Sequence, residues 1–489
     1  MNARRIGHIG WAIAALLAIA PMAAAETQSL VILHDNDIHG HLRAFCYTEV
    51  GKGTVERCDV GGAAKRATLV AKRRAMAQAP VLLIDAGDTT TRGPLATEYE
   101  GIDEVEVMNA IGYDMAAIGN NEFKLKDAAD AQDAAGAQAS LLRLIRRSTF
   151  PWLCANATDA NGALLPGVQP FVVRKVGNLR IAFLGLTAPR SKSYPQAKGL
   201  VIGDPVEAAK LWIPRARAEA DVVIAVTHIG VLDDRRLVRE TRGLDAIVGG
   251  DSHTFLYDLI TEKNLDGVSV PIVQDGEFGV NLGEYHLTFE GDAAAGWRLA
   301  AFTDRLIPVS AKLRPARAIT AIVESYAHPL DIDVGALGAV GATPAERTRL
   351  TAEALAAAWK ASAGAEVGLQ PDGSLFEAFR DREVTRYVVR AVLPFHDTVW
   401  RGEVSGAKLK ALLDNPNPAA GAIRATVASS QIDPARTYSV AAVGFTAQAL
   451  IVGAVDTGAE ARKAAEAWLG AQPPRATNQP LRKPSDALP

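Results

Sequence analysis

The sequence lacks a strong charge of either sign. Its 489 residues include 52 lysines and arginines against 55 aspartates and glutamates, which gives a formal net charge of −3. Basic stretches such as AKRRAM are isolated and do not form a sustained stripe. The electrostatic footprint of a nucleic-acid-binding protein is therefore missing, and we expect no nucleic-acid partner.

Cysteine is scarce as well. The three residues Cys46, Cys58 and Cys154 have spacings that fit no zinc-finger pattern. Cys46 and Cys58 flank a polar, glycine-rich loop, and the sequence leaves open whether they form a disulfide. Cys154 lies in the apolar stretch FPWLCAN, where we expect a buried thiol.

Long apolar runs are absent except near the start of the chain. There, Arg4 and Arg5 precede the run IGWAIAALLAIA, and small residues follow at Ala23 and Ala25. This layout is typical of a secretory signal peptide over residues 1–25. A membrane anchor is the alternative, but about 12 apolar residues are too few to span a bilayer comfortably. We therefore expect a periplasmic or secreted protein with no membrane span after cleavage.

Five apolar runs in the first 300 residues end in polar side chains. The runs are LVILHDNDIHG, VLLIDAGD, MAAIGNN, DVVIAVTHIG and LDAIVGGDSH. Longer helix-like segments lie between them, which predicts an α/β fold of sheets covered by helices. In such folds, sites collect at the carboxyl ends of strands.

The polar residues at these ends form a candidate metal site. A lone Asp after a strand is usually a cap or turn residue, and a lone His is usually structural. Seven nitrogen and oxygen ligands from five strand ends are instead what two divalent cations require. The seven are Asp37, His39, Asp88, Asn120, His228, Asp251 and His253.

The pattern changes along the rest of the chain. We expect a catalytic domain over residues 26–307 and a linker helix and loop over 308–348. A smaller α/β domain is expected over 349–470. The remaining residues, 471–489, are rich in proline and polar residues, which predicts a disordered tail.

Read in order, these motifs resemble the 5′-nucleotidase family of two-domain dimetal phosphoesterases. The resemblance rests on ILHDNDIHGHL, LLIDAGDT, AIGNNEF, VTHIG and GGDSH, and it continues more weakly at LPFHDTVWRGEVSGAKLKALLD. It implies a four-layer αββα metallophosphoesterase sandwich followed by a C-terminal 5′-nucleotidase-type domain. It also implies hydrolysis of a small phosphorylated molecule, for example a nucleotide, in nucleotide catabolism.

The resemblance also implies a ligand set for each of two ions. One ion would bind Asp37, His39, Asp88 and His253, and the other would bind Asp88, Asn120, His228 and Asp251. Two cations about 3.5–4 Å apart can acidify a bridging water and hold the phosphoryl oxygens. The family has a histidine where Asp251 stands. Because Asp is a harder ligand, we expect Mn²⁺ or Mg²⁺ to be favoured over Zn²⁺.

The sequence departs from the family at its catalytic dyad. The family motif reads Gly-Asn-His-Glu-Phe-Asp, and Asn121 and Lys124 occupy the positions of its His and Asp. Asn121 can donate a hydrogen bond to a phosphoryl oxygen but cannot give up a proton at neutral pH. Loss of a positioned general acid typically costs about 10²–10⁴-fold. Lys124 could meet an anionic substrate, or it could simply point to solvent.

The C-terminal region departs further, because Phe376 stands where the family has an Arg and no aromatic base clamp is identifiable. Substrate-binding residues therefore stay unknown. Three hypotheses remain: a hydrolase of phosphoesters or phosphoanhydrides with good leaving groups, a dimetal hydrolase of a sulfur-linked group, and a metal- or phospho-ligand-binding protein with little turnover.

Overall fold

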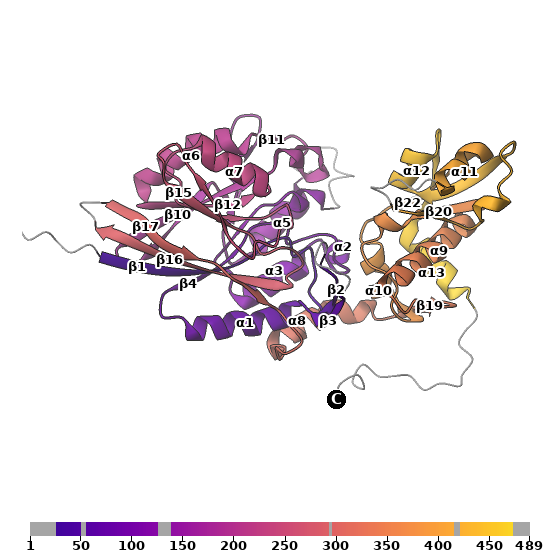
Figure 1. Cartoon of the computed structure of the whole chain (residues 1–489), viewed down its shortest axis with the longest axis horizontal. Coiled ribbons are helices and arrows are strands. Elements are labelled where there is room, and N and C mark those ends of the chain that lie inside the picture. The colour runs from indigo at the N-terminus through magenta and orange to yellow at the C-terminus, as the bar shows by residue number, and fades with distance from the viewer. Residues whose placement is uncertain (1–25, 50–54, 126–137, 293–295, 415–420, 473–489) are drawn as a thin grey trace, which may run out of the picture.

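The computed structural model describes residues 26–49, 55–125, 138–292, 296–414 and 421–472. The expected signal peptide and nearly all of the expected tail lie outside these ranges. The described residues form two domains, which Figure 1 shows side by side. No helix among them is long and apolar enough to cross a bilayer.

Two β-sheets face each other in the N-terminal domain. The first is mixed, with five parallel strands flanked by an antiparallel edge. Its order is β17 (Gly296–Thr303), β16 (Asn281–Asp292), β1 (Glu26–Asp35), β4 (Val81–Asp85), β5 (Met115–Ala117), β6 (Trp152–Leu153) and β8 (Val168–Gln169), and β18 (Leu306–Pro308) also pairs with β16.

The second sheet has six strands, of which the central four are parallel. Its order is β14 (Ile260–Lys263), β15 (Ser269–Val273), β13 (Ala246–Gly249), β12 (Val222–His228), β10 (Leu179–Thr187) and β9 (Phe171–Val176).

Helices cover the outer face of each sheet (Figure 1). Those on the first sheet are α1 (Ala63–Met76), α3 (Ile102–Ile111), α5 (Ala139–Arg147) and α8 (Arg317–Ala327), and those on the second are α6 (Pro205–Glu219) and α7 (Val231–Glu240). The four-layer αββα sandwich expected from the resemblance is therefore present.

The alternation of side chains along β1 explains the layering. Leu30 and Ile32 pack between the two sheets, whereas Val31 and Leu33 pack against the helices. Successive side chains of a strand point to opposite faces, so a strand buried on both faces is a continuous apolar run. Each fully buried aliphatic side chain contributes about 1.5–3 kcal/mol. This burial holds the strand ends, and the loops after them, in place.

The C-terminal domain has one five-stranded sheet with helices on both faces. Its strands are β23 (Ile423–Ala425), β20 (Val367–Pro371), β24 (Thr437–Val443), β22 (Thr398–Ser405) and β25 (Val455–Glu460). Its helices are α9 (Pro344–Ala363), α10 (Arg386–Val392), α11 (Gly406–Asp414), α12 (Gly444–Leu450) and α13 (Ala461–Gly470).

The expected boundary between linker and second domain, at residues 348 and 349, falls inside α9. This helix begins earlier because Thr343 and Glu346 form a capping box: the Thr343 hydroxyl accepts from the Glu346 N–H at 3.2 Å, and the Glu346 carboxylate accepts from the Thr343 N–H at 3.1 Å. Pro344 at the first helical position reinforces the start. The expected connecting helix is present as α8, which packs on α1 and α3.

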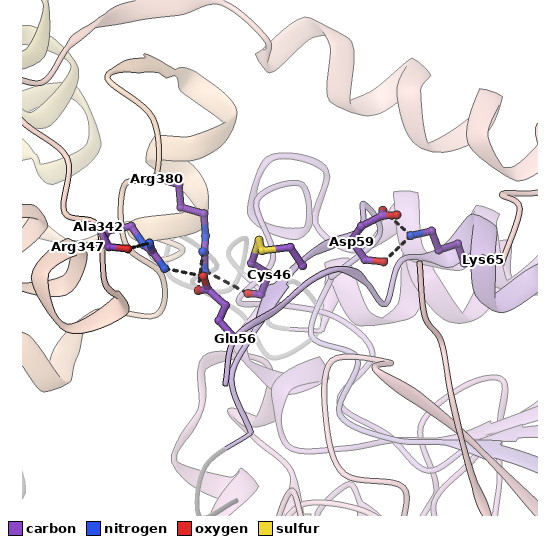
Figure 2. Close-up of a disulfide and its surroundings, with 8 residues drawn as sticks. Cys46, Glu56, Asp59, Lys65, Ala342, Arg347 and Arg380 are labelled. Carbon is purple, nitrogen blue, oxygen red and sulfur yellow. Dashed lines mark hydrogen bonds and ion pairs between the residues drawn. A yellow bond between two sulfur atoms is a disulfide. The ribbon is translucent and has the colours of Figure 1, made fainter. Parts of the chain in front are cut away.

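A disulfide joins Cys46 and Cys58 (Figure 2). It resolves the pairing that the sequence left open, and Cys154 is buried and free as expected. The bridged loop also carries Glu56, which pairs with Arg347 and Arg380 of the C-terminal domain at 2.6 Å each. The loop therefore ties the two domains together.

Candidate metal centre

The seven predicted ligands lie at the carboxyl ends of five parallel strands. Asp37 and His39 follow β1, Asp88 follows β4, and Asn120 follows β5. His228 is the last residue of β12, and Asp251 and His253 follow β13. Because the two sheets face each other, these ends meet in one place. All seven side chains are buried or half-buried there.

Two overlapping groups of these residues have the spacing of metal ligands. Asp37, His39 and His253 each offer one ligand atom, and the three atoms lie within 4.8 Å of one another. Asp37, Asp88 and His228 form a second group of the same kind. Asp88 also faces both groups, because its Oδ2 lies 3.1 Å from His228 Nε2 and 3.8 Å from His39 Nε2.

Five of the seven residues have left-handed backbone conformations. The φ angles are +51° at Asp37, +50° at His39, +58° at Asp88, +85° at Asp251 and +53° at His253. Each such residue costs of order 1–3 kcal/mol unless the fold enforces it. The strands and the packed loops hold these residues in a strained arrangement that turns their side chains toward a common point.

The donor atoms themselves fit a divalent cation. Asp37 Oδ1 and His228 Nε2 are buried, and neither makes a hydrogen bond, although Asp37 Oδ1 lies 3.1 Å from His253 Nε2 and His228 Nε2 lies 3.1 Å from Asp88 Oδ2. A buried polar atom without a partner is costly, and its usual explanation is a ligand or ion. The set also combines carboxylate, amide and imidazole groups, which suit hard and borderline divalent cations.

Neighbouring groups orient the ligands. The Asn36 side-chain amide donates to Asp37 Oδ2 at 2.7 Å, and His228 Nδ1 lies 2.8 Å from the Ala86 carbonyl oxygen. His253 Nδ1 pairs with the Glu277 carboxylate. Such partners fix which imidazole nitrogen faces the metal and strengthen the ligand.

The charged side chains of the site shift one another's pKa values. Burial alone would raise the pKa of Asp37, but His228, His253 and His39 hold it below its ordinary range. Burial would lower the pKa of His228, yet Asp88 and Asp37 raise it to about 9. Because metals bind neutral imidazole, metal binding here releases protons and strengthens with pH.

The Asn121 side chain lies against Asp88, and its buried Oδ1 makes no hydrogen bond. The residue is fully buried, its backbone N–H donates to Asp88 Oδ1 at 2.6 Å, and its side-chain amide donates to Asp88 Oδ2. Gly119 permits this close approach, since a Cβ there would lie 2.3 Å from Asp88 Oδ1. Asn121 therefore positions a predicted ligand. Its amide N–H donates to Asp88, whereas the sequence suggested that it could donate to a phosphoryl oxygen.

Lys124 does not simply point to solvent. It is partly buried, and its Nζ lies 4.5 Å from the centroid of the Tyr194 ring. Lys124 ends the 3₁₀ segment η1 (Asn121–Lys124), and Tyr194 directly precedes the 3₁₀ segment η4 (Pro195–Ala197), which packs on η1. The alternative of a substrate-facing cation gains support from this placement.

Sequence reasoning missed two residues at the site. Arg190, in η3 (Pro189–Ser193), donates to Asn120 Oδ1 at 2.6 Å and to Asp251 Oδ2 at 2.8 Å. Glu277 is the partner of His253. Both follow strands of the second sheet, Arg190 after β10 and Glu277 after β15. The strand-end rule that found the seven ligands would have found them too.

Comparisons with known families agree with this architecture. Residues 30–255 match the calcineurin-like phosphoesterase family, and residues 339–431 match the 5′-nucleotidase C-terminal domain. The chain belongs to the two-domain 5′-nucleotidase family. Its N-terminal match implies divalent metal ions, for which the clusters above offer ligands.

Sequence relatives of this 5′-nucleotidase family member include rat 5′-nucleotidase, which is 31% identical over 57% of the chain and 50% of the relative. The venom 5′-nucleotidase of Gloydius brevicauda is 32% identical over 55% and 46%. The alignments thus span about half the length of these curated relatives.

Solved structures extend the likeness in fold across both domains. The Thermus thermophilus 5′-nucleotidase precursor superposes with a TM-score of 0.70 at 23% identity, over 90% of this chain and 96% of that one. Sulfate thiohydrolase SoxB of the same organism gives 0.67 at 18% identity, over 90% and 94%. At these identities the likeness concerns the fold alone.

Proposed function

We propose that this chain is an exported, metal-dependent phosphoric ester hydrolase with a dinuclear centre. Asp37, His39, Asp88 and His253 would hold one divalent cation, and Asp88, Asn120, His228 and Asp251 the other, with Mn²⁺ or Mg²⁺ favoured. Bound cations of this kind supply a water nucleophile near neutral pH and neutralise charge on a phosphoryl group. The observation that carries the proposal is the convergence of the seven strand-end residues, whose buried Asp37 Oδ1 and His228 Nε2 make no hydrogen bond and lie at ion-pair distance from other predicted ligands.

The surroundings of Asp88 favour substrates with good leaving groups. Asn121 stands where the family resemblance places a catalytic histidine, and its amide is directed at Asp88. An amide cannot protonate a departing alkoxide at neutral pH. Phosphoanhydrides and aryl or otherwise activated esters do not need this proton. The proposed substrates are therefore small phosphorylated molecules of these classes, nucleotides among them.

Hydrolysis rates test the proposal. Manganese-loaded protein should cleave an aryl phosphate at least 10²-fold faster than AMP, a factor of the order that a missing general acid costs. The matched variant Asp88→Asn should lose activity on both substrates. Equal or faster turnover of AMP would refute the leaving-group argument, and a metal-loaded protein inactive on every phosphorylated substrate would refute the hydrolase.

Export is proposed on two grounds. Residues 1–25 have the layout of a signal peptide, with small residues at Ala23 and Ala25. The Cys46–Cys58 disulfide is of the kind that persists in oxidising compartments. Mass spectrometry of the mature protein from a native host should find Glu26 at the N-terminus in the periplasmic or extracellular fraction. An intact leader on cytosolic protein would contradict export.

A binding protein with little turnover is the second candidate, because one observation favours it. Arg190 contacts both Asn120 and Asp251, two of the proposed ligands of the second ion. A chain in which this arginine permanently replaced that ion would bind one cation and turn over slowly. Metal stoichiometry separates the candidates: two ions per chain supports the hydrolase and one supports the binder.

A further inference from the structure

Two cations near the metal centre, Lys124 and Arg92, have no acidic partner among the residues that the structure describes. Lys124 packs on Tyr194, and the Arg92 guanidinium lies 5.8 Å from the centroid of the Phe376 ring. Neither forms an ion pair with a carboxylate in the part of the chain that the structure describes. Arg92 Nε is also buried without a hydrogen-bond partner. Other charged residues of the site form ion pairs, such as Arg190 with Asp251 and His253 with Glu277.

Lys124 lines a cavity between the two domains, and Arg92 is the chain neighbour of Thr91, which also lines it. The cavity has a volume of about 290 Å³ and is lined by Thr91 and Lys124 from the N-terminal domain and by Phe395, His396 and Asp397 from the C-terminal domain. Arg92 follows Thr91 directly, and its neighbour Phe376 contacts Phe395 edge to face at 5.3 Å between centroids. Arg92 and Lys124 therefore approach the same space from two loops.

The positive charges in this space act on one another. Burial, followed by the charge of Arg92, lowers the pKa of Lys124 to about 8, and Arg190 acts in the same direction. Glu100, which also lines the cavity, is engaged by Arg143 at 2.6 Å. Burial raises the pKa of the other lining acid, Asp397, and the charge of Arg462 opposes this shift. Because Arg92 and Lys124 have no carboxylate partner among the described residues, their charges would attract an anion.

The backbone that presents Arg92 is strained. Thr91 and Arg92 are consecutive left-handed residues, each with a φ of +67°. This conformation is rare for a residue other than glycine, and more so for a β-branched one. Strain of this kind persists where the fold holds a side chain in a functional position. The left-handed pair directs Arg92 toward Phe376 and the domain interface.

We propose that Arg92 and Lys124 form a subsite for a second phosphate group, the one that departs with the leaving group. The preferred substrates would then be phosphoanhydrides such as nucleoside diphosphates. This inference rests on the proposed function, because the terminal phosphate must be cleaved at the metal centre. It adds the residues that select the substrate class.

The reaction balances without a protein acid. Water adds to the terminal phosphorus, and the bond from that phosphorus to the bridging oxygen breaks. The bridging oxygen keeps the bonding electron pair and leaves as part of a phosphate, while the water releases a proton to solvent. Fixed cations beside the departing oxygen stabilise the charge that develops there. A phosphate leaving group therefore suits a site in which Asn121 cannot donate a proton.

The test compares kcat/KM for ADP and AMP in the full-length, manganese-loaded protein. Arg92→Gln and Lys124→Gln should each lower the ADP to AMP ratio by about 10- to 100-fold, the value of a charge-assisted hydrogen bond. Lys124→Arg, which keeps the charge, should retain most of the preference. Lys192→Gln is the matched control, because Lys192 is an exposed lysine of η3, and it should leave the ratio unchanged. An unchanged ratio in both Gln variants would overturn the subsite.

A binding measurement separates this inference from the proposed function. If the wild type hydrolyses neither nucleotide, the proposed function fails, and calorimetry with α,β-methylene-ADP still tests the subsite. The wild type should bind this analogue at least tenfold more tightly than Lys124→Gln. Equal affinities, with thermal unfolding showing that both proteins are folded, would overturn the subsite on its own.

Discussion

Asn121 donates hydrogen bonds to both carboxylate oxygens of Asp88. Its backbone N–H donates to Oδ1 at 2.6 Å, and its side-chain amide donates to Oδ2. The Glu122 carboxylate anchors the same loop by accepting from the Asp88 N–H at 3.1 Å. The residue that follows the predicted ligand Asn120 thus serves a different predicted ligand, on the neighbouring strand end. This gives Asn121 a positioning role.

Removing the Asn121 side chain should weaken metal binding. In Asn121→Ala the Asp88 side chain loses one of its two hydrogen bonds from this residue, and loss of an orienting partner typically costs about 10- to 100-fold in metal affinity. Competition titration with a chelating dye measures the change. Asn178→Ala is the control, since Asn178 is exposed and its side-chain amide donates to Glu26 at 3.0 Å. An affinity unchanged by Asn121→Ala would mean that Asp88 is held by its other contacts.

Arg190 should compete with the second cation. Its guanidinium neutralises Asp251 and occupies Asn120 Oδ1, so an incoming ion must displace it. Arg190→Gln removes the charge, and we expect the weaker of two manganese sites to bind about tenfold more tightly, equivalent to about 1.4 kcal/mol. Calorimetric titration resolves the two sites. Weaker binding in the variant would show that Arg190 assists the ion.

Asp234 should make stability depend on pH. This carboxyl is fully buried in α7 and accepts from the Thr227 hydroxyl at 2.6 Å. Burial raises its pKa to about 7 from the 3.8 of an exposed Asp. The folded chain therefore holds the proton more tightly than the unfolded chain, and stability falls as pH rises from about 4 to about 7.

The variant Asp234→Asn removes this titrating carboxyl group and with it the fall in stability as pH rises. Its free energy of unfolding relative to wild type should rise by about 3 kcal/mol between pH 5 and pH 8, since one pKa unit corresponds to about 1.4 kcal/mol. Urea unfolding of both proteins across this range measures the difference, in which the other titrating groups cancel. A difference that stays constant with pH would contradict a raised pKa at Asp234.

The Cys46–Cys58 disulfide should stabilise the mature protein. It joins residues 12 apart in the chain, and closing a loop of about this size contributes about 3 kcal/mol through the entropy of the unfolded state. Cys46→Ala/Cys58→Ala should lose roughly this amount in denaturant unfolding, whereas Cys154→Ala reports only on core packing. A double variant as stable as wild type would show that the loop is held by Glu56 and its arginine partners alone.

The fold was predictable because local signals agreed with its global form. Runs such as LVILHD are apolar on both faces and end in polar residues. This pattern is typical of a strand buried between a second sheet and a layer of helices. The expected linker–domain boundary at residues 348 and 349 falls inside α9, which begins at Pro344. The sequence signature of this start is the capping box Thr343-x-x-Glu346, which lies in a Gly/Ala-rich stretch that resembles a loop.

The sequence predicted seven polar side chains at strand ends, and the structure brings these side chains together, but their contacts could not be predicted. Sequence order placed the seven ligands at strand ends, yet Asn121 could have faced either the substrate or a neighbour. Its orientation depends on Gly119 and on the loop after β4, which come together only in three dimensions. Arg190 follows β10, so the strand-end rule could have named it as a candidate. Its contacts could not be predicted, because Asn120 and Asp251 are 70 and 61 residues away and such long-range pairs have no signature in a single sequence.

Anomalous scattering from a crystal grown with Mn²⁺ and phosphate tests the dinuclear centre most directly. We expect two manganese peaks per chain, one bounded by Asp37, His39 and His253 and the other by Asn120, His228 and Asp251, with Asp88 between them and Arg190 displaced. A single peak with Arg190 still bound to Asp251, or no peak at these residues, would contradict it.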